Sequence, residues 1–139
     1  DSEVRDFAVR HIETEMKHLE LLEGWLDEPD RSSLLPLWKI AGFITGALPA
    51  LFGATPIYAT VQAVETFVVR HYEAQITILS ELKEHEQLCN ILVHCCQDEV
   101  AHGFEAHSLK RNSLSILLRT WCHMIDIGSG LAVNIARRI

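Results

Sequence analysis

The sequence has 139 residues, of which 48% are hydrophobic and 22% are charged, and its formal net charge is −7. This length fits a single folded domain, and the composition excludes a disordered chain. The negative charge argues against a nucleic-acid partner.

Five helical segments and no convincing strand are predicted, so we expect an all-α fold. The first segment covers about Ser2 to Leu26, where apolar residues recur every three or four positions. The second covers Leu34 to Gly53 and is apolar almost all round. The third begins at Thr55-Pro56, because proline suits the first turn of a helix, and ends near Leu82.

A polar break at residues 83–86 separates the third segment from a fourth, which covers Gln87 to Leu109. Asn112-Ser113 is expected to cap a fifth segment, which runs from Leu114 toward Arg138. The fifth segment carries one polar stripe and is otherwise apolar. We therefore expect this helix to lie against an apolar environment over most of its circumference.

Positive charge and hydrophobicity coincide in two parts of the chain. Residues 31–64 contain no Asp or Glu and carry +2, and residues 106–139 carry +4. This pattern is typical of a surface that meets anionic lipid, although a solvated charge bias is the alternative. The second segment is long enough to span a bilayer, but Lys39, two prolines and three glycines favour a helix lying in the membrane interface. A buried crossover helix is the other interpretation.

We expect the second and fifth segments to form one exposed apolar patch with a basic rim, from which the ring of a lipid substrate would reach the interior. The expected patch consists of Trp38, Phe43, Leu48, Phe52, Trp121 and Ile125, and the rim consists of Lys39, Arg119, Arg137 and Arg138.

Two Glu-x-x-His pairs stand on predicted helices, Glu15 with His18 and Glu99 with His102. A spacing of three residues places both side chains on one helical face. A carboxylate that bridges two metals and an imidazole that binds one are what a di-iron site needs from each helix. Alone this signal is weak, because salt-linked surface residues also have this spacing.

Glu65 strengthens the metal hypothesis, because it lies in an otherwise apolar run where a carboxylate is rarely buried without a partner. Residue 82, where the turn is predicted, is midway between Glu65 and Glu99. A hairpin there brings both carboxylates to one level, each about 25 Å from the bend. The second segment is about 30 Å long, so it can return the chain and let the first and third helices run parallel.

At these positions the sequence resembles the demethoxyubiquinone hydroxylases of ubiquinone biosynthesis. The resemblance covers nearly the whole chain in the right order, and its Pro-Leu-Trp and Glu-to-His-Tyr runs are fairly specific. The shared runs are Leu35-Pro36-Leu37-Trp38 with Gly42-Phe43 and Gly46, Ala63-Val64-Glu65 with His71-Tyr72 and Gln75-Ile76, Asp98-Glu99-x-x-His102, and a closing amphipathic helix with Ala132-Val133.

The resemblance implies a ferritin-like bundle with a long apolar crossover helix and a C-terminal amphipathic helix. It implies a di-iron monooxygenase that hydroxylates the ring of a demethoxyubiquinone at a membrane surface. By this likeness Glu15 and Glu99 would bridge the two Fe ions, His18 and His102 would each cap one, and Glu65 would be a terminal ligand.

The same resemblance assigns His71 and Tyr72 to a pair near the substrate that relays electrons or protons, with ordinary packing as the alternative. It suggests reducing equivalents from NADH without a dinucleotide fold. It places the protein on the matrix side of the mitochondrial inner membrane or on a bacterial cytoplasmic membrane. A lipid-binding partner protein of ubiquinone biosynthesis is expected, and a homo-oligomer is left open.

The sequence departs from the family pattern at one point. Residues 1–139 are expected to form one ferritin-like di-iron domain that lacks the family's first bundle helix, and with it the Glu that is the sixth ligand. Because the chain starts at Asp1 rather than Met, we favour truncation over loss of a ligand, and activity of this exact chain is left open.

Two other functions compete with the hydroxylase. One is a metal-binding protein without oxygenation, such as an iron store or a rubrerythrin-like peroxidase, against which the apolar positive segments argue. The other is a metal-free helical module that binds lipid or quinone and a partner protein, with both Glu-x-x-His pairs on its surface.

Overall fold

A computed structural model describes residues 2–26, 32–82, 85–110 and 113–138. Within these ranges the chain is an all-α, ferritin-like bundle without a strand, as the sequence predicts. Among the helices of the described ranges, none is both long enough and apolar enough to cross a membrane. The helices are α1 (Ser2–Glu23), α2 (Leu35–Ala50), α3 (Ala54–Leu82), α4 (Glu86–Leu109) and α5 (Ile116–Ala136).

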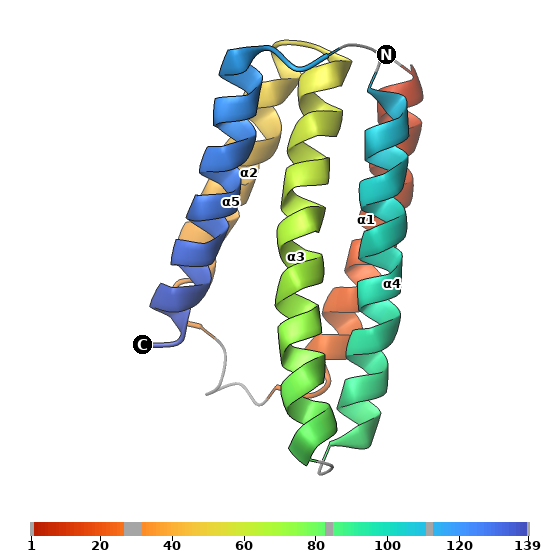
Figure 1. Cartoon of the computed structure of the whole chain (residues 1–139), viewed down its shortest axis with the longest axis vertical. Coiled ribbons are helices and arrows are strands. Elements are labelled where there is room, and N and C mark those ends of the chain that lie inside the picture. The colour runs from red at the N-terminus through yellow and green to blue at the C-terminus, as the bar shows by residue number, and fades with distance from the viewer. Residues whose placement is uncertain (1, 27–31, 83–84, 111–112, 139) are drawn as a thin grey trace.

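Successive helices alternate in direction, so α1 and α3 run parallel, with α2 returning the chain between them (Figure 1). α3 packs most extensively against α4, and it also contacts α5 and α2. α1 packs against α4. α3 therefore lies between the α1 and α4 side of the bundle and a layer made of α2 and α5 (Figure 1).

Local sequence explains most helix ends. Gly53 has a φ of +101°, a conformation that other residues rarely adopt, and it directly precedes α3. α3 ends at Leu82, where the turn is predicted. The predicted cap at Asn112-Ser113 is wrong for Ser113, whereas Asn112 lies outside the described residues. Ser115 caps α5 instead, because its extended backbone lets the hydroxyl oxygen accept a hydrogen bond from the backbone N–H of Leu118 at 3.2 Å.

The apolar core is small and lies where α1 and α3 begin and α4 ends. Phe7, Tyr58 and Ala106 are buried together there, and the rings of Phe7 and Tyr58 meet edge to face at 5.0 Å. Further along the helices, carboxylates and histidines are buried beside Leu92, Cys95 and Cys96. These buried ionisable residues are His11, His18, Glu65, Glu99 and His102. Since buried ionisable groups need partners, this part of the interior is where a functional site is expected.

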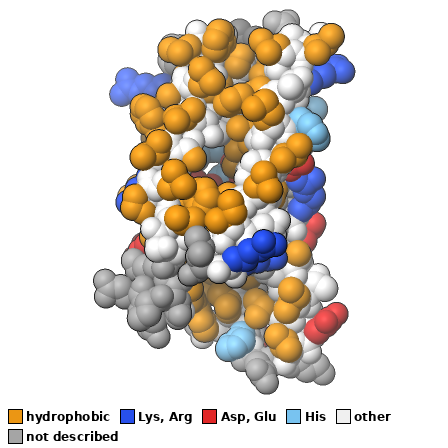
Figure 2. Space-filling view, turned by 90° about the vertical axis from the view of Figure 1, so that its left-hand side faces the viewer, with side chains coloured by type: hydrophobic (Ala, Val, Ile, Leu, Met, Phe, Trp, Pro, Cys, Tyr) orange, Lys and Arg blue, Asp and Glu red, His pale blue; other side chains and the backbone are white. Residues whose placement is uncertain are grey.

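The exposed side chains of α2 and α5 form what we call the outer apolar face (Figure 2). On α2, Phe43 and Phe52 are 75% and 72% exposed, and only Pro49 of that helix is buried, so α2 is not a buried crossover helix within the described structure. The exposed apolar residues of α5 are Ile116, Leu117, Met124, Ile127, Leu131 and Ile135.

The expected composition of this face needs one correction. Trp38, Trp121 and Ile125 are half-buried. Trp121 turns inward because its indole N–H donates a hydrogen bond to Thr60 Oγ1 on α3 at 2.8 Å. The basic residues expected at the rim are all exposed, and Figure 2 shows Lys and Arg side chains at the margins of the hydrophobic surface.

Candidate metal centre

Four of the five predicted ligands meet between α1, α3 and α4. Glu15, Glu65, Glu99 and His102 each offer a donor atom, and these atoms all lie within 4.8 Å of one another. The Glu65 and Glu99 carboxyls lie level because the hairpin between α3 and α4 bends at the expected place. Three carboxylates and one imidazole at this separation could hold a divalent transition metal.

His18 joins the same cluster from α1. Its Nδ1 lies 3.1 Å from Glu99 Oε1 and 3.8 Å from Glu15 Oε2. Its Nε2 lies 3.0 Å from Asp98 Oδ2. Metal-binding histidines commonly donate their second ring N–H to a carboxylate, which fixes the ring orientation. Asp98 therefore orients His18, a role that sequence analysis did not assign, because Asp98 lies on a different helix from its partner.

His102 is the fifth predicted ligand, and its contacts leave buried polar atoms without hydrogen bonds. Its Nδ1 lies 3.4 Å from Glu15 Oε1 and 3.4 Å from Glu99 Oε2. Both Glu99 Oε2 and His102 Nδ1 are buried without a hydrogen-bond partner. A buried polar atom without a hydrogen bond destabilises the fold by about 1–3 kcal/mol. The presence of two such atoms side by side therefore needs an explanation. A cation between them satisfies both, and this donor set therefore fits iron.

The electrostatics of the cluster favour a positive charge. Burial raises the pKa of Glu65 to about 7, with a further increase from Glu15, although a hydrogen bond with Glu99 opposes the rise. Burial, followed by the negative charges of Glu65 and Glu15, raises the pKa of Glu99 to about 8. Without a cation, the pair therefore retains protons near neutral pH, and a bound metal would replace them.

One side of the cluster is open. The Glu15 side chain is 49% exposed even though its oxygens face both histidines. Beside it, α1 presents an exposed apolar stripe at three- and four-residue spacing, made of Val9, Ile12, Met16 and Leu19. The Glu15 carboxylate therefore faces solvent on one side and the two histidines on the other.

A second approach to the cluster is a groove of about 320 Å³ between α3 and α4, which has Glu65 and Glu99 among its lining residues. Val69, Val100 and Phe104 make part of its wall apolar. We expect a substrate ring to arrive from the α2 and α5 side, and Arg70, which also lines this groove, is ion-paired with Asp126 of α5.

The two predicted relay residues lie on different sides of α3. Tyr72 is half-buried, and its pKa is raised by burial and then by negative charge on Cys95, Glu99 and Glu15, which places it on the side of the cluster. His71 stacks parallel to Phe67 at a ring separation of 6.0 Å. Its pKa is lowered by burial and then by Arg137, which follows α5. Tyr72 is thus influenced by the charges of the cluster, whereas His71 contacts Phe67 and is influenced by the charge of Arg137.

Comparisons of the sequence with known proteins identify a family and several relatives. The family model described as ubiquinone biosynthesis protein COQ7 matches residues 1–136. The chain is similar to the NADPH-dependent 3-demethoxyubiquinone 3-hydroxylases, mitochondrial, of Mus musculus (37% identical over 110 residues, covering 76% of this chain and 49% of the relative) and Rattus norvegicus (31% over 110 residues, with the same coverage). The Dictyostelium discoideum protein of that name is 26% identical over 140 residues, covering 98% of this chain and 62% of the relative.

The chain spans about half the length of the mammalian relatives it matches. No solved structure matches it.

Proposed function

Because this chain belongs to the ubiquinone biosynthesis protein COQ7 family, we propose that it hydroxylates the ring of a demethoxyubiquinone at a di-iron centre on a membrane surface. The observation that carries the proposal is the convergence of the donor atoms of Glu15, Glu65, Glu99 and His102 within 4.8 Å, with His18 in contact with Glu99. Relatives with this activity in their names support the substrate class.

In this proposal each predicted ligand has a role that its position supports. Glu15 and Glu99 would be shared by the two ions, since each lies close to both histidines. His18 of α1 and His102 of α4 would each hold one ion, and Glu65 of α3 would complete the set. Two iron ions held by such a set supply activation of molecular oxygen when they are bound.

The remaining tasks fall to the chain's own residues. The groove between α3 and α4 orients a quinone ring near Glu65 and Glu99, and its apolar wall excludes water from one side. The Tyr72 phenol stays protonated, because burial raises its pKa, and it can donate a hydrogen bond or a proton beside the cluster. His71 acts at most indirectly, because its contacts are with Phe67 and the α5 side.

The reductant in the proposal is a nicotinamide nucleotide. The sequence led us to expect NADH, whereas the names of the relatives specify NADPH. Both transfer a hydride, so a direct comparison of the two with purified protein is the test of this point.

Membrane engagement rests on the outer apolar face of α2 and α5. Asp126, the single acid in these two helices, forms an ion pair with Arg70 of α3, which leaves the face to apolar and basic side chains. A continuous apolar surface with a cationic rim is suited to an anionic bilayer. The relatives are named as mitochondrial, which supports a peripheral place on the inner mitochondrial membrane.

Two measurements test the proposal together. Metal analysis of the purified protein should find two Fe per chain, and the protein should convert a short-tailed demethoxyubiquinone in the presence of ¹⁸O₂ and NADPH or NADH into a product that contains one ¹⁸O atom. Glu99→Ala should abolish both iron binding and product formation while the helix persists, because alanine favours helix.

The results also separate the competing functions. Full product formation by the Glu99→Ala protein would rule out the metal centre. Iron binding without ¹⁸O in the product would favour an iron store or peroxidase, and a metal-free protein that retains quinone would favour a lipid-binding module.

A further inference from the structure

His11 is a buried histidine that the proposed di-iron set does not use. It is 7% exposed, and it forms a second donor group with Glu65 and His102, again with all donor atoms within 4.8 Å of one another. We propose that His11 is a third nitrogen ligand of the centre, at the metal position that also takes Glu65 and His102. This inference rests on the proposed metal centre and adds a residue to it.

The His11 ring packs against two other rings. It stacks on the His102 ring with centroids 4.0 Å apart and planes 27° apart. It also meets the Phe7 ring, with centroids 3.9 Å apart and planes 38° apart. A ring in contact with two others cannot rotate freely, so its nitrogen atoms are presented in a fixed direction, as a ligand requires.

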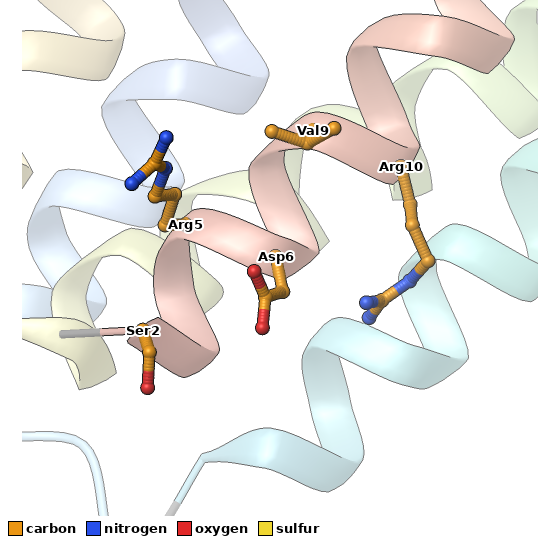
Figure 3. Close-up of a pocket in the computed structure, with 5 residues that line it drawn as sticks. All are labelled: Ser2, Arg5, Asp6, Val9 and Arg10. Atoms are coloured by element: carbon orange, nitrogen blue, oxygen red, sulfur yellow. The ribbon is translucent and has the colours of Figure 1, made fainter.

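A carboxylate determines which nitrogen of His11 carries the proton. Nε2 lies 3.2 Å from Glu105 Oε2, and Glu105 is ion-paired with Arg10. Figure 3 shows the Arg10 side chain extending from α1 toward α4. Because an ionised carboxylate can only accept, Nε2 donates its hydrogen, and Nδ1 keeps the lone pair that a metal needs.

The same support exists for His18, whose Nε2 contacts Asp98 while Nδ1 faces the cluster. A histidine with a carboxylate on one nitrogen and other metal donors beside it is the usual arrangement of a metal ligand.

The position of His11 on α1 agrees with this role. His11, Glu15 and His18 are separated by four and three residues, so they share one face of the helix. The Glu-x-x-His pattern finds only the last two. A surface hollow nearby, lined by Ser2, Arg5, Asp6, Val9 and Arg10, contains exposed side chains only and offers no buried donor (Figure 3).

Cobalt is a suitable probe, because Co²⁺ takes the same nitrogen and oxygen ligands and strongly shifts the proton resonances of the histidines it binds. The full chain loaded with two equivalents of Co²⁺ should show three strongly shifted, solvent-exchangeable imidazole N–H resonances, one each from His11, His18 and His102. Two such resonances would mean that His11 is not a ligand.

His11→Phe provides the matched variant, because it keeps a ring in the stack and removes both nitrogens. In a Co²⁺ titration followed by absorption, this variant should lose at least about tenfold in affinity at one of the two metal positions and should lose one shifted resonance. Glu105→Gln, which leaves the His11 nitrogens in place, should retain three resonances.

Each result supports or overturns the inference. An unchanged titration in a His11→Phe protein with normal circular dichroism would overturn it and leave the five-ligand centre standing. If the wild-type chain binds no Co²⁺, the metal centre fails and this inference fails with it. If His11→Phe does not fold, the number of resonances in the wild-type protein decides alone.

Discussion

Replacing Glu99 by Gln should stabilise the metal-free protein at alkaline pH, because Glu99 is a buried acid whose pKa is raised. Its side chain is 2% exposed, and its pKa of about 8 compares with 4.5 in an exposed glutamate. The folded state therefore holds a proton that the unfolded state has already released. That contribution to stability is complete below pH 4.5 and is lost as the pH rises toward 8.

The interval from pH 6.5 to 8.5 isolates this effect. The lowered pKa values of His11 and His102 change the free energy of unfolding only below about pH 6.5. The raised pKa value of Cys95 changes it only above about pH 9. Each pKa unit corresponds to about 1.4 kcal/mol, so the free energy of unfolding should fall by about 2 kcal/mol between pH 6.5 and 8. Glu65, with a pKa of about 7, adds a smaller loss in the same direction.

Urea unfolding in the presence of a chelator measures this loss. With a slope of about 2 kcal/mol per molar urea, the midpoint of the wild type should be about 1 M lower at pH 8.5 than at pH 6.5. Glu99→Gln should show only the smaller fall in midpoint that Glu65 causes, while Glu13→Gln, at an exposed site on α1, should behave like the wild type. Adding Co²⁺ should reverse the trend, because metal binding requires the deprotonated carboxylates. A wild-type midpoint that does not move, or an equal drop in Glu99→Gln, would refute the reasoning.

Three further outcomes are expected. Asp98→Asn should keep the fold and weaken Co²⁺ binding about 10- to 100-fold in a titration, because His18 loses its orienting carboxylate; unchanged affinity would remove Asp98 from the centre. Tyr72→Phe should retain both metals and reduce hydroxylation about 100-fold, measured as product per minute, whereas full turnover would exclude a proton-donating phenol. Phe43→Ser combined with Phe52→Ser should abolish flotation with anionic liposomes, while Phe104→Ser, which is equally exposed on α4, should float like the wild type. If the wild type stays in solution with every lipid, the outer apolar face is a protein interface instead.

The helices could be predicted from the sequence because their ends carry local signals. Pro56 in the first turn of α3 and the polar break after Leu82 fix two boundaries within a residue or two. The cap of α5 was missed because Ser113 and Ser115 are equally good capping residues in sequence, and only the backbone conformation at Ser115 distinguishes them.

The site could be predicted only where its residues share a helix or flank a hairpin. Glu15 with His18, Glu99 with His102, and Glu65 opposite Glu99 satisfy that condition, and all five donors converge. Asp98 and His11 contribute through contacts between α1 and α4 that join residues 80 and 94 positions apart in sequence. Periodicity within one helix contains no information about such contacts. For the same reason the hydrogen bond that turns Trp121 inward was invisible in the sequence of α5.

The central position of α3 makes it a rigid connection between the carboxylate and histidine cluster and the outer apolar face. The helix has 29 residues, no glycine and a single proline in its first turn, so it has no built-in hinge. Glu65 faces the metal cluster, while Thr60 and Arg70 hold Trp121 and Asp126 of the outer layer. A lipid surface that shifts α5 would move α3 as one body and would change the geometry at Glu65. By thermodynamic reciprocity, metal loading would then change the affinity for the bilayer by the same factor, and the two binding events would form a linked equilibrium.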